Sequence, residues 1–155
     1  MIVVRQAKPE DADSAVKAVR RSITELCAED HQGDEKTLDY WLSNKTPEYF
    51  RSWLADKDNF CAVAEIDGQL AGVALLHRSG EIKLFYLAPG MQRRGAGRAL
   101  HAALEQRAKE WGLESLHLNS TALAKPFYEA LGYHSIDVAK PHFGVLCCQP
   151  YEKTL

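Results

Sequence analysis

Residues 92–98 read Gln92-Arg93-Arg94-Gly95-Ala96-Gly97-Arg98, between an apolar stretch and a stretch with helical periodicity. The first amide groups of a helix have no partner within the helix, and the helix dipole adds partial positive charge there. Gly95 and Gly97 let a bulky anion approach the backbone closely. Successive main-chain amides form a concave nest for phosphate oxygens, and three arginines add formal charge around it. The loop therefore predicts a pyrophosphate site. The alternative is a turn made flexible by its glycines, with solvated arginines.

Two common nucleotide-binding motifs do not match this loop. A dinucleotide fingerprint needs G-x-G-x-x-G, but Leu100 stands where the third glycine would be. A P-loop needs G-x-x-x-x-G-K-[ST]. Gly90 and Gly95 have its first spacing, but Ala96 and Gly97 replace the lysine and the hydroxyl residue. Both nucleotide interpretations fail at the residue that would do the chemistry.

Outward from the loop, the apolar periodicity alternates between strands and helices. Asp67-Gly68, between two β-rich runs, is a strong hairpin signal. Leu100, Leu104 and Ala108 recur at helical spacing, and residues 29–34 are expected to break the first helix. The expected strands span residues 2–5, 60–66, 70–77, 81–88, 115–119, 133–138 and 143–148. The expected helices begin near residues 9, 35, 47, 97 and 122.

This order of elements predicts one α+β domain over residues 1–155, a common domain size. Its centre is expected to be a mostly antiparallel mixed sheet of six to seven strands, flanked by four to five helices. The net charge of -2 argues against a general nucleic-acid binder. No apolar run approaches the ~20 residues of a membrane span, and the amino terminus is too quickly polar for a signal peptide. A cytoplasmic protein without a membrane partner is the default expectation.

The cysteines, histidines and early acidic residues predict no metal site. The four cysteines contain no C-x-x-C pair and are expected as small buried hydrophobic residues. The six histidines are scattered without metal-ligand spacing. Asp30, Asp34 and Glu35 are expected in a solvated acidic loop, with attraction of a cation as the alternative.

Several segments, in this order, resemble the GNAT superfamily of N-acetyltransferases. Gln92-x-x-Gly95-x-Gly97 matches the family's pyrophosphate loop, and residues 85–89, Phe-Tyr-Leu-Ala-Pro, are similar to the strand before it. Residues 127–133, Phe-Tyr-Glu-Ala-Leu-Gly-Tyr, resemble a late signature of the family. The ordered set covers nearly the whole chain and is most similar to small, single-domain bacterial-type members.

The resemblance implies that acetyl-CoA binds as co-substrate in a cleft where two central strands splay apart. Backbone groups of Leu87 and Ala88 would bind the thioester carbonyl and the pantetheine arm, and Asn119 would bind the pantetheine. Amides of the loop would bind the pyrophosphate. The residues expected to bind the cofactor are Leu87, Ala88, Gln92, Arg93, Arg94, Gly95, Ala96, Gly97, Arg98 and Asn119.

Acetyl transfer to an amine needs a group that takes the ammonium proton and one that protonates the departing thiolate. Tyr128 is the candidate acid, because a phenol with a pKa near ~10 stays protonated at neutral pH; a core aromatic is the alternative. Glu81 is the candidate base, at the position where histone-acetylating members keep a glutamate. Ordered water as base, with Glu81 an exposed strand-end carboxylate, is the alternative.

The implied reaction is direct attack by a primary amine of a small molecule, amino acid or peptide within a ternary complex. The acceptor pocket is expected from the early helices and the last strand pair, with candidates Ser22, Cys27, Tyr40, Trp41 and Trp53. A protein-lysine or N-terminal acetyltransferase and a non-catalytic CoA-binding regulatory domain are the alternatives. A homodimer is common in the family.

Overall fold

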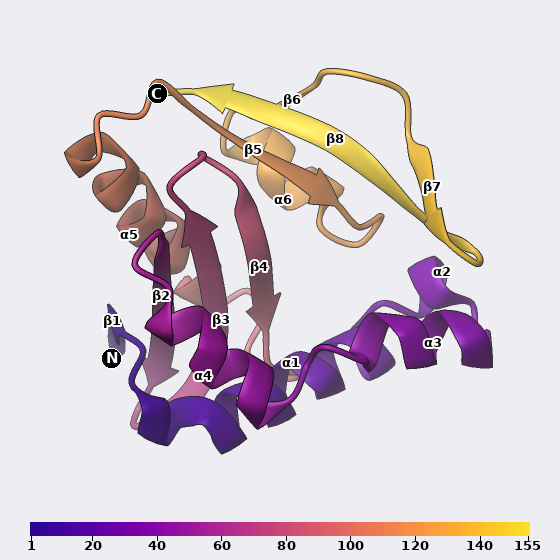
Figure 1. Ribbon diagram of the computed structural model, residues 1–155, viewed down its shortest axis with the longest axis horizontal. Helices are drawn as coiled ribbons and strands as arrows, with labels where there is room; N and C mark the ends of the chain where they lie inside the picture. The colour runs from indigo at the N-terminus through magenta and orange to yellow at the C-terminus, as the bar shows by residue number, and fades with distance from the viewer.

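The computed structural model describes residues 1–155 and places eight strands in two sheets (Figure 1). Asp67 and Gly68, which connect β2 to β3, have φ angles of 50° and 84°. A type I′ turn needs positive φ at both central residues, so the predicted hairpin is confirmed. The first sheet has the antiparallel order β1 (Ile2–Gln6), β2 (Asn59–Ile66), β3 (Gln69–His77) and β4 (Ile82–Leu87).

The second sheet lies above the first in Figure 1 and diverges from it. It pairs β5 (Ser115–Ser120) and β6 (His134–Ser135) with β8 (Leu146–Thr154), and β7 (Lys140–Phe143) pairs with another part of β8. All of these pairs are antiparallel. A single isolated parallel bridge, between Glu81 and His117, joins the two sheets. The centre is therefore mixed and mostly antiparallel, as predicted, and it opens between β4 and β5.

Helices cover both faces of the first sheet. Val19 and Ile23 of α1 (Ala12–Leu26) pack in one cluster with Val63 and Leu75 of the sheet. None of the helices is both long and apolar enough to cross a membrane. The further helices are η1 (Pro9–Asp11), α2 (Ala28–His31), α3 (Glu35–Leu42), α4 (Pro47–Ala55) and α6 (Lys125–Ala130).

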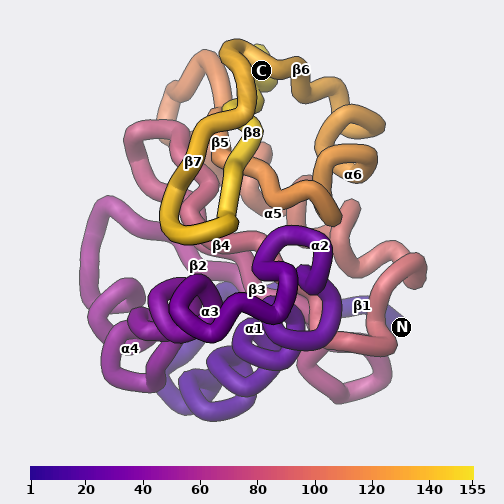
Figure 2. The backbone as a smooth tube through the Cα atoms, turned by 90° about the vertical axis from the view of Figure 1, so that its right-hand side faces the viewer, coloured from indigo at the N-terminus to yellow at the C-terminus, as the bar shows by residue number.

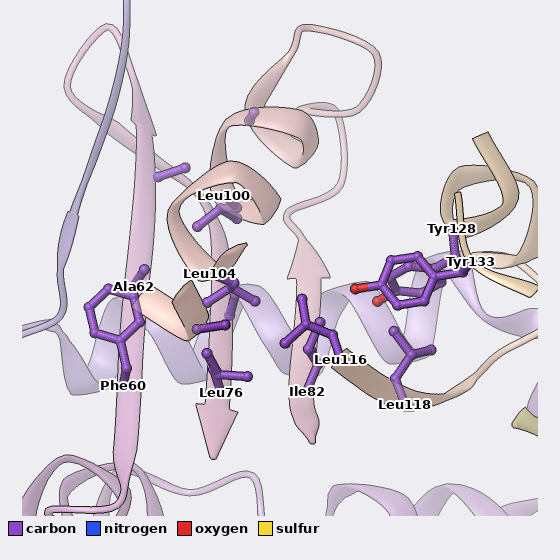
Figure 3. Packing of buried hydrophobic residues seen from close by; sticks show 14 of the residues in the cluster. Phe60, Ala62, Leu76, Ile82, Leu100, Leu104, Leu116, Leu118, Tyr128 and Tyr133 are labelled. Atoms are coloured by element: carbon purple, nitrogen blue, oxygen red, sulfur yellow. The ribbon is translucent and has the colours of Figure 1, made fainter. Parts of the chain in front are cut away.

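The other face of the first sheet is covered by α5 (Ala96–Glu110), the helix that follows the pyrophosphate loop. Leu100 and Leu104 are fully buried in a cluster with Ala62 and Leu76 (Figure 3). Burying a leucine side chain contributes roughly 1.5–3 kcal/mol. This packing fixes the direction of α5 and hence the position of its amino terminus. Burial on both faces also explains why β2 is continuously apolar rather than alternating.

The structure differs from the sequence prediction at three short elements. Residues 29–34 do not simply break the first helix, because they contain most of α2. The C-cap of α2 is Gln32, which has a φ of 54°. The predicted strand 133–138 shrinks to two residues. The predicted strand 143–148 spans a hairpin turn at Gly144, after which β8 continues to Thr154. The polar composition of residues 149–154 hides this strand, since β8 buries only Leu146 and Tyr151.

Candidate active site

A cleft of about 650 Å³ opens where β4 leaves β5. Leu75 and Leu76 are consecutive in β3, but their partners in β4 skip Lys83, which is an extra residue in that strand. Such a β-bulge bends its strand and increases the local twist. The cleft is lined by β4, β5, the loop before α5, α6 and the end of α1. The bulge in β4 is therefore a physical cause of the opening.

The predicted pyrophosphate loop forms part of this cleft. Gly95 is the N-cap of α5 with a φ of 95°, and Arg93 has a φ of 62°. Glycine adopts such a φ without the steric cost that a Cβ brings. Gln92 Oε1 accepts a hydrogen bond of 2.9 Å from Gly90 N–H, which holds the loop in shape. Free amides at a helix terminus, preceded by left-handed residues, are an arrangement that binds anions in proteins.

Gly97, in the first turn of α5, has no room for a side chain. A Cβ at this position would lie 3.1 Å from Phe127 Cε1 and 3.5 Å from Leu87 Cδ1. The wall of the cleft is therefore bare backbone where α5 meets α6 and β4. A diphosphate needs this close approach to reach main-chain amides.

The backbone of β4 offers free polar groups to the cleft at Leu87 but not at Ala88. Ala88 N–H donates to Ala71 O (2.8 Å), and Ala88 O accepts from Met91 N–H (3.0 Å). Residues bonded to the neighbouring strand alternate with residues that point away from it in antiparallel pairs. The N–H and C=O of Leu87 therefore point away from β3, and Leu87 lines the cleft. Free main-chain groups for the predicted role are thus present at Leu87 but not at Ala88.

Tyr128 lies on α6 and lines the same cleft as the loop. This residue is 4% exposed, and its ring packs edge-on against that of Tyr133, with centroids 5.3 Å apart (Figure 3). The ring of Phe85 also packs edge-on against it, with centroids 6.0 Å apart. Burial raises the pKa of Tyr128 well above its ordinary value of 10.0. The phenol therefore stays protonated at neutral pH, and burial also makes it a weaker acid than a free phenol.

A second cavity of about 300 Å³ adjoins the cleft, because Tyr86 and Asn119 line both. Trp41 Nε1 donates a hydrogen bond of 3.2 Å to the Tyr86 hydroxyl at this junction. Glu81 lines only the second cavity, and it is half-buried. The structure therefore places the candidate base in the adjoining cavity, apart from the cleft that holds Tyr128.

The second cavity depends on the β7–β8 hairpin packing on α3, and Figure 2 shows the hairpin tip next to that helix. The rings of Tyr40 and Phe143 stack with centroids 4.1 Å apart. Thr37 Oγ1 accepts a hydrogen bond of 3.1 Å from Val145 N–H and fills the space where a Cβ of Gly144 would stand. The early helices and the last strand pair thus meet here, as the sequence suggested for the acceptor pocket.

Residues 27–155 match a family model described as an acetyltransferase (GNAT) domain. The chain belongs to the GNAT acetyltransferase family. It is 34% identical to peptidyl-lysine N-acetyltransferase YiaC of Escherichia coli (strain K12) over 88 residues, which are 57% of this chain and 58% of that protein. The chain therefore matches less than two thirds of that relative's length.

Solved structures with low sequence identity share the GNAT fold over nearly the whole chain. A GCN5-related N-acetyltransferase from Rhodopseudomonas palustris superposes with a TM-score of 0.86 at 24% identity, covering 99% of this chain and 95% of that one. PaiA N-acetyltransferase from Thermoplasma acidophilum, solved in complex with coenzyme A, superposes with a TM-score of 0.83 at 20% identity. That match covers 100% of this chain and 99% of the other.

Within this GNAT domain, most of the residues expected to bind the cofactor share the cleft. Those that line it are Leu87, Gln92, Arg93, Gly95, Gly97, Arg98 and Asn119. Those that do not are Ala88, Arg94 and Ala96. Of the acceptor-pocket candidates, Ser22 and Cys27 line the cleft, and Tyr40 and Trp41 line the second cavity. Trp53 instead packs against buried Phe50.

The sequence did not predict the burial or exposure of three side chains. Lys45 is buried and lines the second cavity, although it lies in a polar loop. Asp30 is 6% exposed rather than solvated, and its Oδ1 accepts from Ala122 N–H (2.7 Å). Cys147 is exposed, contrary to the expectation for the cysteines. No group of three or more His, Cys, Asp and Glu side chains is arranged to hold a metal ion.

Proposed function

We propose that this protein transfers the acetyl group of acetyl-CoA to a primary amine of a small molecule, amino acid or peptide. The proposal depends on one observation: Tyr128 and the loop at Gly95 line the same cleft, and this cleft adjoins a second cavity along β4. One cavity would hold the acyl donor and the other the amine. Membership of the GNAT family and the coenzyme A complex of PaiA support this assignment.

The residues of the cleft fit acetyl-CoA. The bare backbone at Gly97 and the nest at Gly95 would hold the pyrophosphate, with Arg93 and Arg98 adding positive charge. The free main-chain groups of Leu87 would bind the extended pantetheine arm, as an added strand would. When bound, acetyl-CoA supplies an activated acyl group, whose carbonyl carbon accepts the amine and whose sulfur departs as a thiolate.

Three groups of this chain would act on the reaction. The N–H of Leu87 would donate to the thioester carbonyl oxygen as negative charge develops there. Tyr128 would donate its phenolic proton to the sulfur while the new C–N bond forms and the C–S bond breaks. Glu81, or water in the second cavity, would take the proton that the ammonium loses. The proton balance closes when Tyr128 regains a proton from solvent.

Acetylation of a lysine side chain in a peptide or protein is the second candidate, favoured by the similarity to YiaC. The second cavity favours a small acceptor instead, because it holds only about 300 Å³. A non-catalytic CoA-binding role is disfavoured because Tyr128 lies in the cleft. A cytoplasmic location and a homodimer stay predictions.

The test is a screen of free amino acids, diamines, aminoglycosides and lysine peptides with acetyl-CoA, with thiol release as the readout. Wild-type protein should release thiol with at least one acceptor, and mass spectrometry should find an added acetyl group on its nitrogen. A Tyr128→Phe variant serves as the matched control, because it keeps the ring. Binding of acetyl-CoA by calorimetry without thiol release above the protein-free background for any amine would contradict a catalytic role.

A further inference from the structure

The second cavity contains a buried ammonium group that has no carboxylate partner. Lys45 is 8% exposed and lines this cavity. Its Nζ donates hydrogen bonds to Trp41 O (3.2 Å) and Asn44 Oδ1 (2.6 Å), and both acceptors are neutral. An ammonium has three N–H groups, so one remains for a ligand. Buried lysines are usually paired, which makes this arrangement unusual.

The loop that carries Lys45 is held in place by its backbone. Arg20 Nη1 donates to Leu42 O (2.9 Å) and to Lys45 O (3.0 Å), and Lys45 N–H donates to Leu42 O (3.0 Å). Thr46, which follows, is the N-cap of α4 and accepts from Tyr49 N–H (3.2 Å). The ammonium is therefore positioned by a fixed turn between two helices.

The carbonyl of Trp41 lies in the last turn of α3, where the helix dipole carries partial negative charge. This partial charge offsets only part of the cost of burying the ammonium. Burial lowers the pKa of Lys45 to about 8, with no carboxylate acting to raise it. A ligand anion would supply the missing counter-charge.

Charged side chains of both signs lie around the two cavities. Asp30 is itself buried. Burial raises the pKa of Tyr86 and raises the pKa of Cys148 to about 11, and the negative charge of Asp30 raises both pKa values further. Lys83 also lines both cavities, so the amine is placed at the junction by its need to reach the acyl group in the cleft, whereas Lys45 favours a negative group. Glu81 is the carboxylate that lines the second cavity, and it makes no ion pair with Lys45; exposed Lys83 and His142 add basic groups.

We propose that the acceptor is an amino carboxylate, with its carboxylate bound by Lys45 and its amine at the junction near Tyr86. The inference rests on the proposed function, because it names the substrate class of that same site. A single point-charge ammonium matches the single negative charge of a carboxylate. The 300 Å³ cavity has room for a small amino acid or the end of a short peptide. Polyamines, which carry no anion, should be poor acceptors.

The experiment compares the twenty common amino acids with their carboxamides in the thiol-release assay. Wild-type protein should prefer the carboxylate, and Lys45→Met should raise its KM by about 10- to 100-fold, as expected for a lost hydrogen bond to a charged group. The KM of the carboxamide should rise less, because its neutral oxygen loses a weaker hydrogen bond than the carboxylate does. Lys45→Arg, which keeps the charge, should recover part of the preference. Lys36→Met, an exposed residue of α3, is the matched control.

Two outcomes would overturn the inference while leaving acetyl transfer standing. One is an equal KM for carboxylates and carboxamides in the wild type. The other is a lower melting temperature in Lys45→Met with an unchanged preference, which would reduce Lys45 to a stabiliser of the α3 terminus. If no amine is acetylated, calorimetry of the same amino acids with CoA-loaded protein decides: carboxylate-dependent binding that Lys45→Met abolishes supports Lys45, and absence of binding overturns it.

Discussion

Gly95→Asp should weaken acetyl-CoA binding because it places a carboxylate where the pyrophosphate is expected. Gly95 caps α5, so the new carboxylate would itself occupy the free amides of the helix terminus. Two like charges ~5 Å apart repel by roughly 1–3 kcal/mol at effective dielectric constants between those of a protein surface and water. The lost attraction of the helix terminus adds about 0.3–1 kcal/mol.

Together these terms predict that the Kd for acetyl-CoA rises by about ten- to a thousandfold. The fold should survive at a cost of about 1–2 kcal/mol in stability. The φ of 95° strains any residue with a Cβ by this amount, whereas an aspartate N-cap exceeds a glycine N-cap by only about a few tenths of a kcal/mol. A Cβ would also meet Ile2 Cδ1 at 3.2 Å, a contact that the end of a side chain can relieve.

Isothermal titration calorimetry at low salt measures the effect directly, and thermal unfolding verifies the fold. Gly112→Asp is the matched control, because it changes a glycine with a φ of 75° at the far end of α5 and adds the same charge. The control should lose stability but keep its affinity for acetyl-CoA. Equal affinities in wild type and folded Gly95→Asp would refute the assignment of the pyrophosphate site to this loop.

Three further predictions concern single side chains. Tyr128→Phe should lower kcat by about tenfold to a thousandfold and keep acetyl-CoA affinity within a few-fold, because only the proton donor is lost; wild-type turnover would assign that proton to water. Glu81→Gln should lower kcat and shift the acid limb of the pH–rate profile, and an unchanged profile would leave Glu81 without a role. Burial lowers the pKa of His101 to about 4, while unfolded histidine titrates near 6.5, so the unfolded state gains the proton first on acidification. Chemical denaturation should therefore show stability falling by up to ~3 kcal/mol between pH 6.5 and 4, and His101→Gln should flatten that slope.

The cofactor cleft could be predicted largely from short segments of the sequence. The loop at Gly95 needs only a strand, two glycines and a helix in succession, because its anion site is made from neighbouring amides. The turn at Asp67-Gly68 is local in the same sense. Ala88 shows the limit of this reasoning: which amides of a strand face its neighbour depends on the register between β3 and β4, and no local pattern fixes it.

The bulge at Lys83 likewise depends on the register between β3 and β4. It is a mismatch in the pairing of two strands, and the residues of β4 alone give no sign of it. Asp30 was wrongly expected in solvent for a related reason. Its burial depends on a hydrogen bond from Ala122, 92 residues later in the chain, which neither segment specifies by itself.

The acceptor cavity is hidden from the sequence because none of its walls is complete without a distant segment. Lys45 lies in a polar loop, where exposure is the ordinary expectation. The cavity that it lines closes only when the hairpin around Gly144 packs on Thr37 of α3, about a hundred residues earlier. Local motifs therefore specify the loop that is proposed to hold the donor, whereas tertiary packing between early helices and the last strands shapes the cavity that is proposed to admit the amine. The family resemblance could thus imply acetyl-CoA but could not name the acceptor, and the charge at Lys45 narrows that choice.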